Sequence, residues 1–317
     1  MFDKRRLNVH LYVTPICNLN CKHCYYNSKS QDFFLVNFLQ IDELSFIIRK
    51  LYDNFDIAID AEGGEFFLRE DVSRLFEIVP SNCWNKITIT TNGVKRMKID
   101  LNHLHNLDEF RVSVEGHNDI MQQDIRGISL KPVLKTCEEL RLNGVPITLR
   151  VTLHKKNYKY LNEMIEFFLG LNIKRFSFYE FQPVGRGKLY ENEYKLDGAE
   201  MENILKLLLK INIDSRLDIL KFNLGSARNQ IVNAYKTELN ENGYKILNLQ
   251  GVPSLTINYN GELGICPWNI GQDTIGKFHK SSFISDITKY IEDCILDHEC
   301  MHCSAKRILY QGERYNI

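Results

Sequence analysis

Residues 7–28 read LNVHLYVTPICNLNCKHCYYNS, an apolar run followed by closely spaced cysteines. The run is rich in β-branched and aromatic residues and predicts a strand. Cys17, Cys21 and Cys24 follow it in the spacing C-x3-C-x2-C, with no fourth cysteine close behind. A structural zinc site normally has four ligands, and His23 lies between two cysteines where it cannot easily complete a tetrahedron with both. Three thiolates suit an iron–sulfur cluster with one open iron; zinc or unrelated core cysteines are the alternative.

The first strand opens a repeating pattern of strands and helices. Predicted strands cover 7–14, 57–61, 86–91, 109–114, 147–152 and 175–181, and helical periodicity covers 41–54, 71–79, 130–143 and 158–169. Six such units in series predict a parallel sheet with right-handed crossovers. We therefore expect an α/β fold, a partial (β/α)6 TIM-type barrel. In such barrels the loops after the strands carry the chemistry, and the first of these loops contains the three cysteines.

Past residue 195 the pattern changes to helical stretches and then to a hairpin. The sequence SLTINYNGELGIC, residues 254–266, predicts two short strands joined by a turn at Asn260-Gly261. We expect the barrel over residues 1–195, a helical connection over 196–250 and a small β-hairpin plus helix domain over 251–317. The last segment carries a second group of cysteines, at Cys266, Cys294, Cys300 and Cys303.

The composition restricts the partners and the compartment. The chain has 317 residues, of which 44% are hydrophobic and 25% charged, enough for a globular protein with a sizeable core. Lys plus Arg equals Asp plus Glu at 40 each, so we expect no nucleic-acid partner and no anionic membrane surface. The chain shows neither a signal-peptide pattern nor an apolar run of membrane-spanning length, which predicts a cytoplasmic protein. Nine cysteines in a reducing compartment favour metal ligands or reactive thiols over disulfides, although the isolated Cys83 and Cys137 are predicted to be core residues.

The motifs and their order resemble the radical S-adenosylmethionine (SAM) superfamily, over about residues 7 to 190. The hallmark of that family is C-x3-C-x2-C after the first barrel strand. Further motifs resemble the family at AEGGEFFLRED (61–71), ITTNG (89–93), VSVEGHNDIMQQDIRG (112–127) and FQPVGRGK (181–188). The resemblance implies that Cys17, Cys21 and Cys24 hold a 4Fe-4S cluster whose open iron binds SAM.

The resemblance also implies which residues bind SAM. They are Gly63, Gly64 and Glu65 for its amino group, Thr91 and Asn92 at the ribose-facing end of strand three, and Ser113 and Arg126 for its carboxylate. Glu115 stands where the family usually has aspartate. Taken singly, the glycine pair could be a tight turn, and Ser113 and Arg126 a cap and a solvated charge.

The C-terminal cysteines resemble the twitch, or shortened SPASM, domain of radical SAM enzymes. That resemblance implies one auxiliary 4Fe-4S cluster, with Cys266, Cys294, Cys300 and Cys303 as its ligands. The family usually has a cysteine where Asn248 stands, so Cys294 would fill the vacancy. Its other possible role is a free thiol that returns a hydrogen atom to the substrate radical. A zinc knuckle on Cys300 and Cys303 is the alternative to a cluster.

Radical SAM enzymes reductively cleave SAM to a 5′-deoxyadenosyl radical that removes hydrogen from a substrate, with an electron from an external donor such as flavodoxin or ferredoxin. The resemblance favours modification of a ribosomally made peptide by epimerisation, crosslinking or thioether formation. A dehydrogenase or epimerase of a small carbohydrate-like molecule is the second hypothesis. A noncatalytic iron–sulfur or zinc protein is the third.

Overall fold

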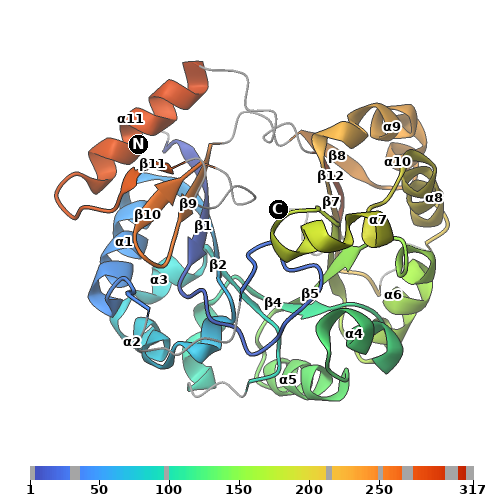
Figure 1. Cartoon of the computed structure of the whole chain (residues 1–317), viewed down its shortest axis with the longest axis horizontal. Helices are drawn as coiled ribbons and strands as arrows, with labels where there is room; N and C mark the ends of the chain where they lie inside the picture. Colours follow the sequence, from blue (N-terminus) through green and yellow to red (C-terminus); the bar gives the residue numbers. More distant parts are fainter. Residues whose placement is uncertain are drawn as a thin grey trace.

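The computed structural model describes residues 4–28, 36–95, 100–211, 216–248, 253–265, 274–296 and 306–311. Within these residues twelve strands form one sheet, in the order β11-β10-β9-β1-β2-β3-β4-β5-β6-β7-β12-β8. Its parallel neighbours are β1 (Arg6–Tyr12), β2 (Asp56–Glu62), β3 (Ile87–Thr91), β4 (Glu109–Val114), β5 (Ile147–Leu153), β6 (Arg175–Glu180) and β7 (Ile219–Leu224). Figure 1 shows the sheet curving around a central space, with helices on its outer side. The predicted partial barrel is confirmed, and β7 adds a further parallel strand.

The helices between these strands lie close to where the sequence predicts them. The first begins at Ile41, after a capping box between Gln40 and Glu43, and another carries Pro132 in its first turn. The α-helices are α1 (Ile41–Asn54), α2 (Leu75–Ile78), α3 (Ser81–Trp84), α4 (Asp119–Arg126), α5 (Lys131–Leu142), α6 (Leu161–Gly170) and α7 (Glu191–Tyr194). Short 3-10 helices are η2 (Phe66–Leu68), η3 (Glu70–Arg74), η4 (Leu101–Asn106), η5 (Tyr158–Tyr160) and η6 (Gly185–Tyr190). The helix predicted over 71–79 is split between η3 and α2.

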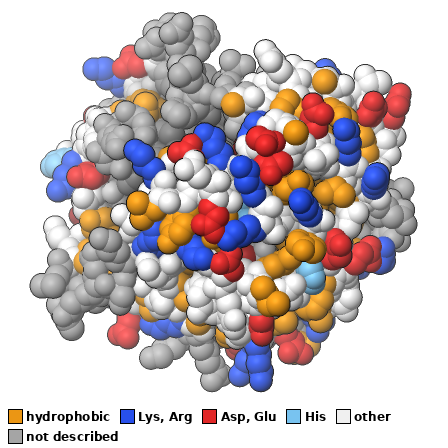
Figure 2. Space-filling view, turned by 45° about the vertical axis from the view of Figure 1, so that its right-hand side comes forward, with side chains coloured by type: hydrophobic (Ala, Val, Ile, Leu, Met, Phe, Trp, Pro, Cys, Tyr) orange, Lys and Arg blue, Asp and Glu red, His pale blue; other side chains and the backbone are white. Residues whose placement is uncertain are grey.

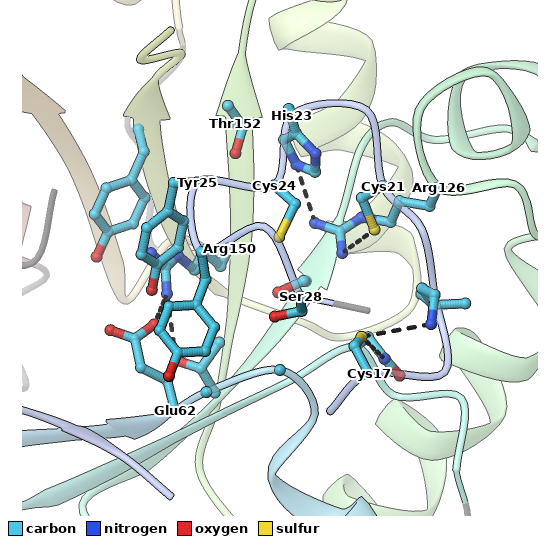
Figure 3. A pocket seen from close by; sticks show the side chains of 18 of the residues that line it. Cys17, Cys21, His23, Cys24, Tyr25, Ser28, Glu62, Arg126, Arg150 and Thr152 are labelled. Atoms are coloured by element: carbon cyan, nitrogen blue, oxygen red, sulfur yellow. Dashed lines mark hydrogen bonds and ion pairs between the residues drawn. The ribbon is translucent and has the colours of Figure 1, made fainter. Parts of the chain in front are cut away.

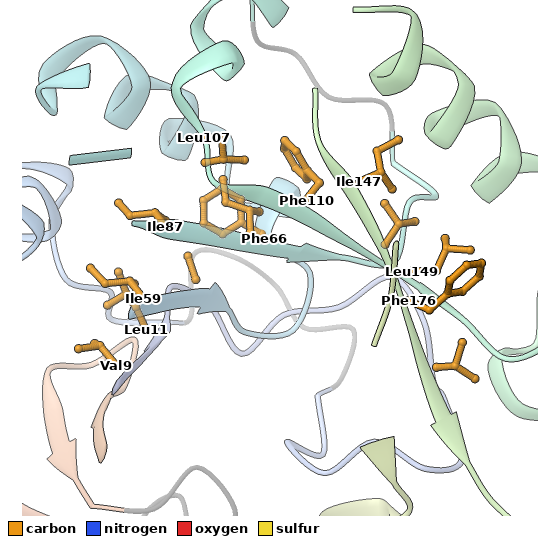
Figure 4. Close-up of a cluster of buried hydrophobic side chains, with 14 of the residues drawn as sticks. Val9, Leu11, Ile59, Phe66, Ile87, Leu107, Phe110, Ile147, Leu149 and Phe176 are labelled. Carbon is orange, nitrogen blue, oxygen red and sulfur yellow. The ribbon is translucent and has the colours of Figure 1, made fainter. Parts of the chain in front are cut away.

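The two faces of the barrel sheet differ in chemistry. Apolar side chains on the helix-facing side form the main core, and Figure 4 shows a part of it that includes Val9, Leu11, Ile59, Phe110 and Leu149. Residues between them along the same strands are polar or charged, among them His10, Asp60, Arg111 and Arg150. Because successive side chains point to opposite faces of a strand, these polar residues line the inside of the barrel.

The stretch predicted as a helical connection, residues 196–250, also contains strands. Its helices are α8 (Gly198–Leu208), α9 (Asn229–Ala234) and α10 (Lys236–Glu241), with the 3-10 turn η7 (Ser226–Arg228). Its strands are β7, next to β6, and β8 (Lys245–Asn248). A purely helical connection is therefore wrong. In β7, buried Leu220 and Phe222 alternate with the partly exposed Lys221 and Asn223, a period-two pattern that a polar interior makes hard to recognise.

The described C-terminal segments extend the sheet at both edges, as Figure 1 shows. The predicted hairpin is present as β9 (Ser254–Ile257) and β10 (Glu262–Gly264), with Gly261 at φ 85° in the turn. Strand β9 pairs with β1, β10 pairs with β11 (Thr274–Lys277), and β12 (Lys306–Gln311) pairs with β7 and β8. The division into three domains stays a prediction.

The second cysteine group falls mostly outside the described residues. Cys266, Cys300 and Cys303 lie outside them, and so does the side chain of Cys294, which stands in α11 (Phe283–Leu296). The auxiliary cluster and the alternative roles of Cys294 therefore stay predictions. Cys83 and Cys137 are buried, as expected for core residues.

The surface agrees with the balanced composition. Figure 2 shows Lys and Arg side chains interspersed with Asp and Glu side chains and small hydrophobic areas. Among the helices of the described residues, none has the length and apolar character needed to span a bilayer.

Candidate functional site

One cavity lies at the carboxyl ends of the parallel strands, beside the cysteine loop that follows β1 (Figure 3). Its empty space, with the open mouth included, is about 920 Å³. Most of the predicted site residues line it, namely Cys17, Cys21, Cys24, Gly63, Gly64, Thr91, Asn92, Ser113 and Arg126. Glu65 is not among the lining residues.

The three cysteines stand around one side of this cavity in Figure 3. Cys17 and Cys21 are buried and Cys24 is half-buried. Burial raises the pKa of the Cys17 thiol to about 12 and that of the Cys21 thiol to about 11. Backbone N–H of Leu19 and Nδ2 of Asn92 donate to Cys17 Sγ, at 3.4 and 3.8 Å. Neutral thiols are thus favoured in the metal-free chain, and a bound metal would be needed to hold them as thiolates.

The donor set suits an iron–sulfur cluster. The three cysteines line one cavity, and N–H groups of Leu19 and Asn92 donate to Cys17 Sγ. N–H groups that donate to the sulfurs are a usual feature around such clusters. The assignment of a cluster to Cys17, Cys21 and Cys24 stays a prediction.

The glycine pair after β2 holds the start of the cysteine loop through its backbone. Gly64 N donates to Thr14 O at 2.6 Å, and Glu65 N donates to Ile16 O at 2.8 Å. A Cβ on Gly63 would lie 2.4 Å from Thr14 O, and a Cβ on Gly64 would lie 2.0 Å from Ile16 O. Only glycine permits so close an approach of two backbones.

The carboxylate of Glu65 lies beside the end of β3. It is buried and accepts hydrogen bonds from Thr91 Oγ1 and Asn92 N, each at 2.7 Å. Burial raises its pKa despite these donors. Glu65 thereby positions the end of β3, and its contact with the amino group of SAM stays a prediction.

The glycine-arginine motif after β6 holds the other end of the loop. Arg186 N donates to Cys24 O at 2.9 Å, and Arg186 Nη1 donates to Cys21 O at 2.8 Å. Gly185 has φ 56°, and a Cβ there would lie 2.2 Å from Tyr25 O. Both ends of the cysteine loop are therefore fixed by main-chain contacts with glycine-containing turns.

A buried carboxylate supports the middle of the loop. Glu115, fully buried, lies with Oε1 2.7 Å from both His23 Nε2 and Arg126 Nη2. Burial alone would raise the pKa of Glu115, but His23 and Arg126 bring it below its usual value. Arg126 Nη1 lies 3.9 Å from Cys21 Sγ, and His154 Nε2 lies 3.7 Å from Glu115 Oε2. Arg126, a predicted SAM contact, is therefore fixed in place beside a predicted cluster ligand.

Strand residues that the sequence analysis did not single out form another side of the cavity. We call Glu62, Thr90, Arg150, Thr152 and Tyr179 the strand wall. Figure 3 shows Arg150 and Glu62 apart from the three cysteines. Parallel strands in barrels usually read as continuous apolar runs, so charges at alternate positions were the signal that could have found this wall.

The cysteine wall, in contrast, comes mainly from loops. We use this name for Cys17, Cys21, Cys24, Gly63, Gly64, Asn92 and Arg126. Ser113 and Thr91, at the ends of β4 and β3, lie in the same cavity.

The chain resembles known proteins both in sequence and in fold. Residues 11–168 match the family described as the radical SAM superfamily. The chain is 25% identical over 221 residues to a probable GTP 3′,8-cyclase of Saccharolobus islandicus, covering 68% of this chain and 69% of that protein. It is also 25% identical over 187 residues to the antilisterial bacteriocin subtilosin biosynthesis protein AlbA of Bacillus subtilis, covering 57% of this chain and 41% of AlbA. The crystal structure of Streptococcus suis SuiB bound to precursor peptide SuiA shares the fold, with TM-score 0.69, 17% identity and coverage of 94% of this chain and 66% of that one.

Proposed function

The chain belongs to the radical SAM superfamily and is an enzyme that uses a 4Fe-4S cluster and SAM, and we propose that it modifies a ribosomally synthesised peptide. The observation that carries the proposal is the extent of the likeness to SuiB, which was solved with a precursor peptide and matches 94% of this chain. AlbA, named for bacteriocin biosynthesis, supports a peptide substrate from sequence. The modification would be an epimerisation, a crosslink or a thioether.

The cysteine wall would hold the cofactors. Cys17, Cys21 and Cys24 would be the cluster ligands. A reduced cluster of this kind with SAM supplies a 5′-deoxyadenosyl radical, which can remove hydrogen from an unactivated carbon. The residues of the chain position the reactants and exclude water. Asn92 donates toward one sulfur, and the ion pair with Glu115 holds Arg126 in place beside the cysteines.

The remaining cofactor contacts are part of the proposal. The backbone at Gly63-Gly64 and Glu65 would receive the amino group of SAM. Thr91 and Asn92 would face its ribose, and Ser113 and Arg126 would bind its carboxylate. An auxiliary cluster on Cys266, Cys294, Cys300 and Cys303 stays a prediction. So do an external flavodoxin or ferredoxin as electron donor and a cytoplasmic location.

A small-molecule substrate is the second candidate. The observation that favours it is the sequence likeness to probable GTP 3′,8-cyclases, which covers 68% of this chain. This likeness adds a nucleotide to the small-molecule candidates, and the carbohydrate-like molecule stays a prediction. Since the chain is an enzyme, the noncatalytic alternative is set aside.

Deuterium transfer tests the proposal directly. Anaerobically reconstituted and reduced enzyme is incubated with SAM and with deuterated peptides encoded by short reading frames beside its gene. We expect deuterium in 5′-deoxyadenosine, measured by mass spectrometry, and a modified peptide. A parallel reaction contains GTP instead. If 5′-deoxyadenosine forms in step with GTP consumption and none of the peptides transfers deuterium, the peptide proposal is rejected.

A further inference from the structure

Arg150 on β5 uses only part of its hydrogen-bonding capacity within the protein. Its Nη1 donates to Glu62 Oε2 at 2.9 Å and to Thr90 Oγ1 at 3.4 Å. Within the described residues, Nε and Nη2 of Arg150 have no hydrogen-bond partner, and the side chain lines the cavity. The side chain is 16% exposed. Donors that face a cavity without a protein partner are candidates for ligand contacts.

Tyr179 on β6 determines which part of the guanidinium is available. Its ring centroid lies 4.5 Å from Arg150 Cζ, so the ring covers one face of the guanidinium. Stacking leaves the N–H groups at the edge free to donate in the plane, the geometry that suits a two-oxygen acceptor. The hydroxyl of Tyr179 also lacks a hydrogen-bond partner among the described residues.

The charges nearby favour an acceptor rather than a donor as ligand. Glu62 Oε1 is already 3.2 Å from His10 Nδ1, while its Oε2 receives Arg150. Arg111 is held separately, with Nη1 2.6 Å from Asp60 Oδ1. The carboxylates are thus occupied, whereas Arg150 retains unused donors.

The electrostatic potential around Tyr179 and Arg150 also favours an anionic ligand. Burial alone would raise the pKa of Tyr179, but the guanidinium groups of Arg111 and Arg150 together bring it below its usual value. A tyrosine hydroxyl that is easier to ionise than usual despite burial reports a positive potential at this position. An anionic oxygen beside Arg150 would therefore be stabilised.

We infer that Arg150 and Tyr179 form a substrate subsite for an oxyanion, a carboxylate or a phosphate, on the strand wall of the cavity. The inference rests on the proposed function and specifies its substrate. Applied to a peptide, it requires an Asp, a Glu or a C-terminal carboxylate near the residue that loses hydrogen. Arginine binds such groups through paired N–H···O contacts, and the tyrosine hydroxyl would add a third donor.

SAM itself carries a carboxylate and is the competing occupant. Arg150 pairs with Ser113 across β4 and β5, and Ser113 is one of the residues proposed for the SAM carboxylate. The experiment must therefore be done with SAM already bound.

Nuclear magnetic resonance of the arginine side chains tests the subsite. Enzyme labelled with ¹⁵N-arginine is reconstituted anaerobically and saturated with SAM without reductant, so that SAM is not consumed. The Arg150 Nε–H signal is assigned by its loss in Arg150→Lys. The probes are N-acetylglutamate N-methylamide with its glutamine counterpart as neutral match, and GTP with guanosine as neutral match.

We expect a saturable shift of the Arg150 signal with the glutamate probe and none with its neutral match. A shift with GTP alone would assign the oxyanion to a nucleotide phosphate and reject the acidic peptide. No shift with either anion rejects the subsite. If SAM alone shifts the Arg150 signal and the probes cause no further shift, Arg150 binds SAM and the substrate subsite is rejected.

Substitutions of Arg150 and Tyr179 test whether these side chains bind the glutamate probe, apart from any effect on folding. Arg150→Lys should weaken binding of the glutamate probe about tenfold, measured by calorimetry, because it loses the paired contact. Tyr179→Phe should weaken it less, by about threefold. If Arg150→Lys fails to fold, the double variant Glu62→Gln/Arg150→Gln removes both charges together and should also lose binding. The control Arg216→Lys, at an exposed ion pair, should bind the probe normally.

The inference and the proposed function fail in different ways. Deuterium transfer from a peptide that lacks any carboxylate near the modified residue would reject the subsite and keep the peptide function. Probe binding at Arg150 with no deuterium transfer from any peptide would keep the subsite and reject the peptide.

Discussion

The cysteine wall and the strand wall face the same cavity but are built differently. The cysteine wall is held mostly by backbone: turns at Gly63-Gly64 and at Gly185 bond main chain to main chain. The strand wall is held by side-chain charges such as the Arg150–Glu62 pair. The backbone contacts of the cysteine wall leave little freedom of sequence, which would suit a wall that holds a cofactor. The side-chain contacts of the strand wall can change residue by residue without disturbing the backbone, which suits a surface that selects the substrate.

Glu115→Gln tests a buried ion pair that supports the cysteine wall. Removal of the carboxylate charge leaves Arg126 buried without its partner, and we expect a loss of about 3 to 5 kcal/mol in the free energy of unfolding. Denaturant unfolding of the metal-free chain measures it. Glu115→Asp keeps the charge and should lose less. Equal stability of Glu115→Gln and the unmodified chain would show that the loop needs no charge.

The second test concerns Glu109, a buried carboxylate at the base of the barrel, below the strand wall. Burial alone would raise its pKa, but Arg111 and Arg175 help to lower it to about 2. Since the folded pKa lies below the usual value, its stabilisation is present above about pH 4 and is lost as the pH falls toward 2, on the order of 3 kcal/mol in all.

Glu109→Gln should therefore flatten the dependence of the unfolding free energy on pH in this acid range, as measured by denaturant titrations at several pH values. The matched control is Glu166→Gln, which removes an exposed carboxylate and should change the curve by less than about 1 kcal/mol. If the unfolding free energy of Glu109→Gln fell with decreasing pH as steeply as that of the unmodified chain, Glu109 would not be the source of this stabilisation.

Gly64→Ala tests the backbone contact of the cysteine wall. Its Cβ would lie 2.0 Å from Ile16 O, and a carbonyl cannot move aside as a flexible side chain can. We expect a loss of about 2 to 3 kcal/mol in stability and a lower iron content after reconstitution. Gly170→Ala, where a Cβ meets nothing within 4 Å, is the control and should keep full iron. Full iron content in Gly64→Ala would mean that the close approach is not required.

Glu65→Gln has the smallest expected effect and separates positioning from direct contact. The amide places an N–H group where Thr91 or Asn92 needs an acceptor, so we expect a loss of about 1 to 2 kcal/mol in the stability of the chain without SAM. Thermal and denaturant unfolding measure it, and calorimetry gives the SAM affinity. Unchanged stability with strongly weakened SAM binding would favour a direct contact of Glu65 with SAM over a positioning role.

The fold could be predicted well because it follows from local patterns. The strands and helices of the barrel alternate in hydrophobic period along the sequence, and the predicted hairpin turn is found at Gly261. Strand β7 was missed because Lys221 and Asn223 face a polar interior and interrupt the apolar run. How the C-terminal strands pair with β1 and β7 depends on long-range contacts that no local pattern records.

Some residues of the candidate site could also be predicted from the sequence, and others could not. Residues of the cysteine wall were predicted, since close backbone approach demands glycine and a cluster demands cysteine. The contact of Glu65 with SAM stays a prediction, because its motif does not reveal whether the carboxylate serves SAM as well as Asn92. Arg150 and Tyr179 were missed, because each is an ordinary residue in a strand until the barrel closes around it.

The most direct test of the cysteine wall as the site of SAM cleavage is the amount of 5′-deoxyadenosine formed by reduced, reconstituted enzyme and by its Cys17→Ala/Cys21→Ala/Cys24→Ala variant. Mass spectrometry quantifies the product, and iron analysis shows whether any auxiliary cluster remains. We expect product from the unmodified enzyme and none from the triple variant, since the open iron would be lost. A triple variant that still forms 5′-deoxyadenosine would contradict the assignment of these three cysteines.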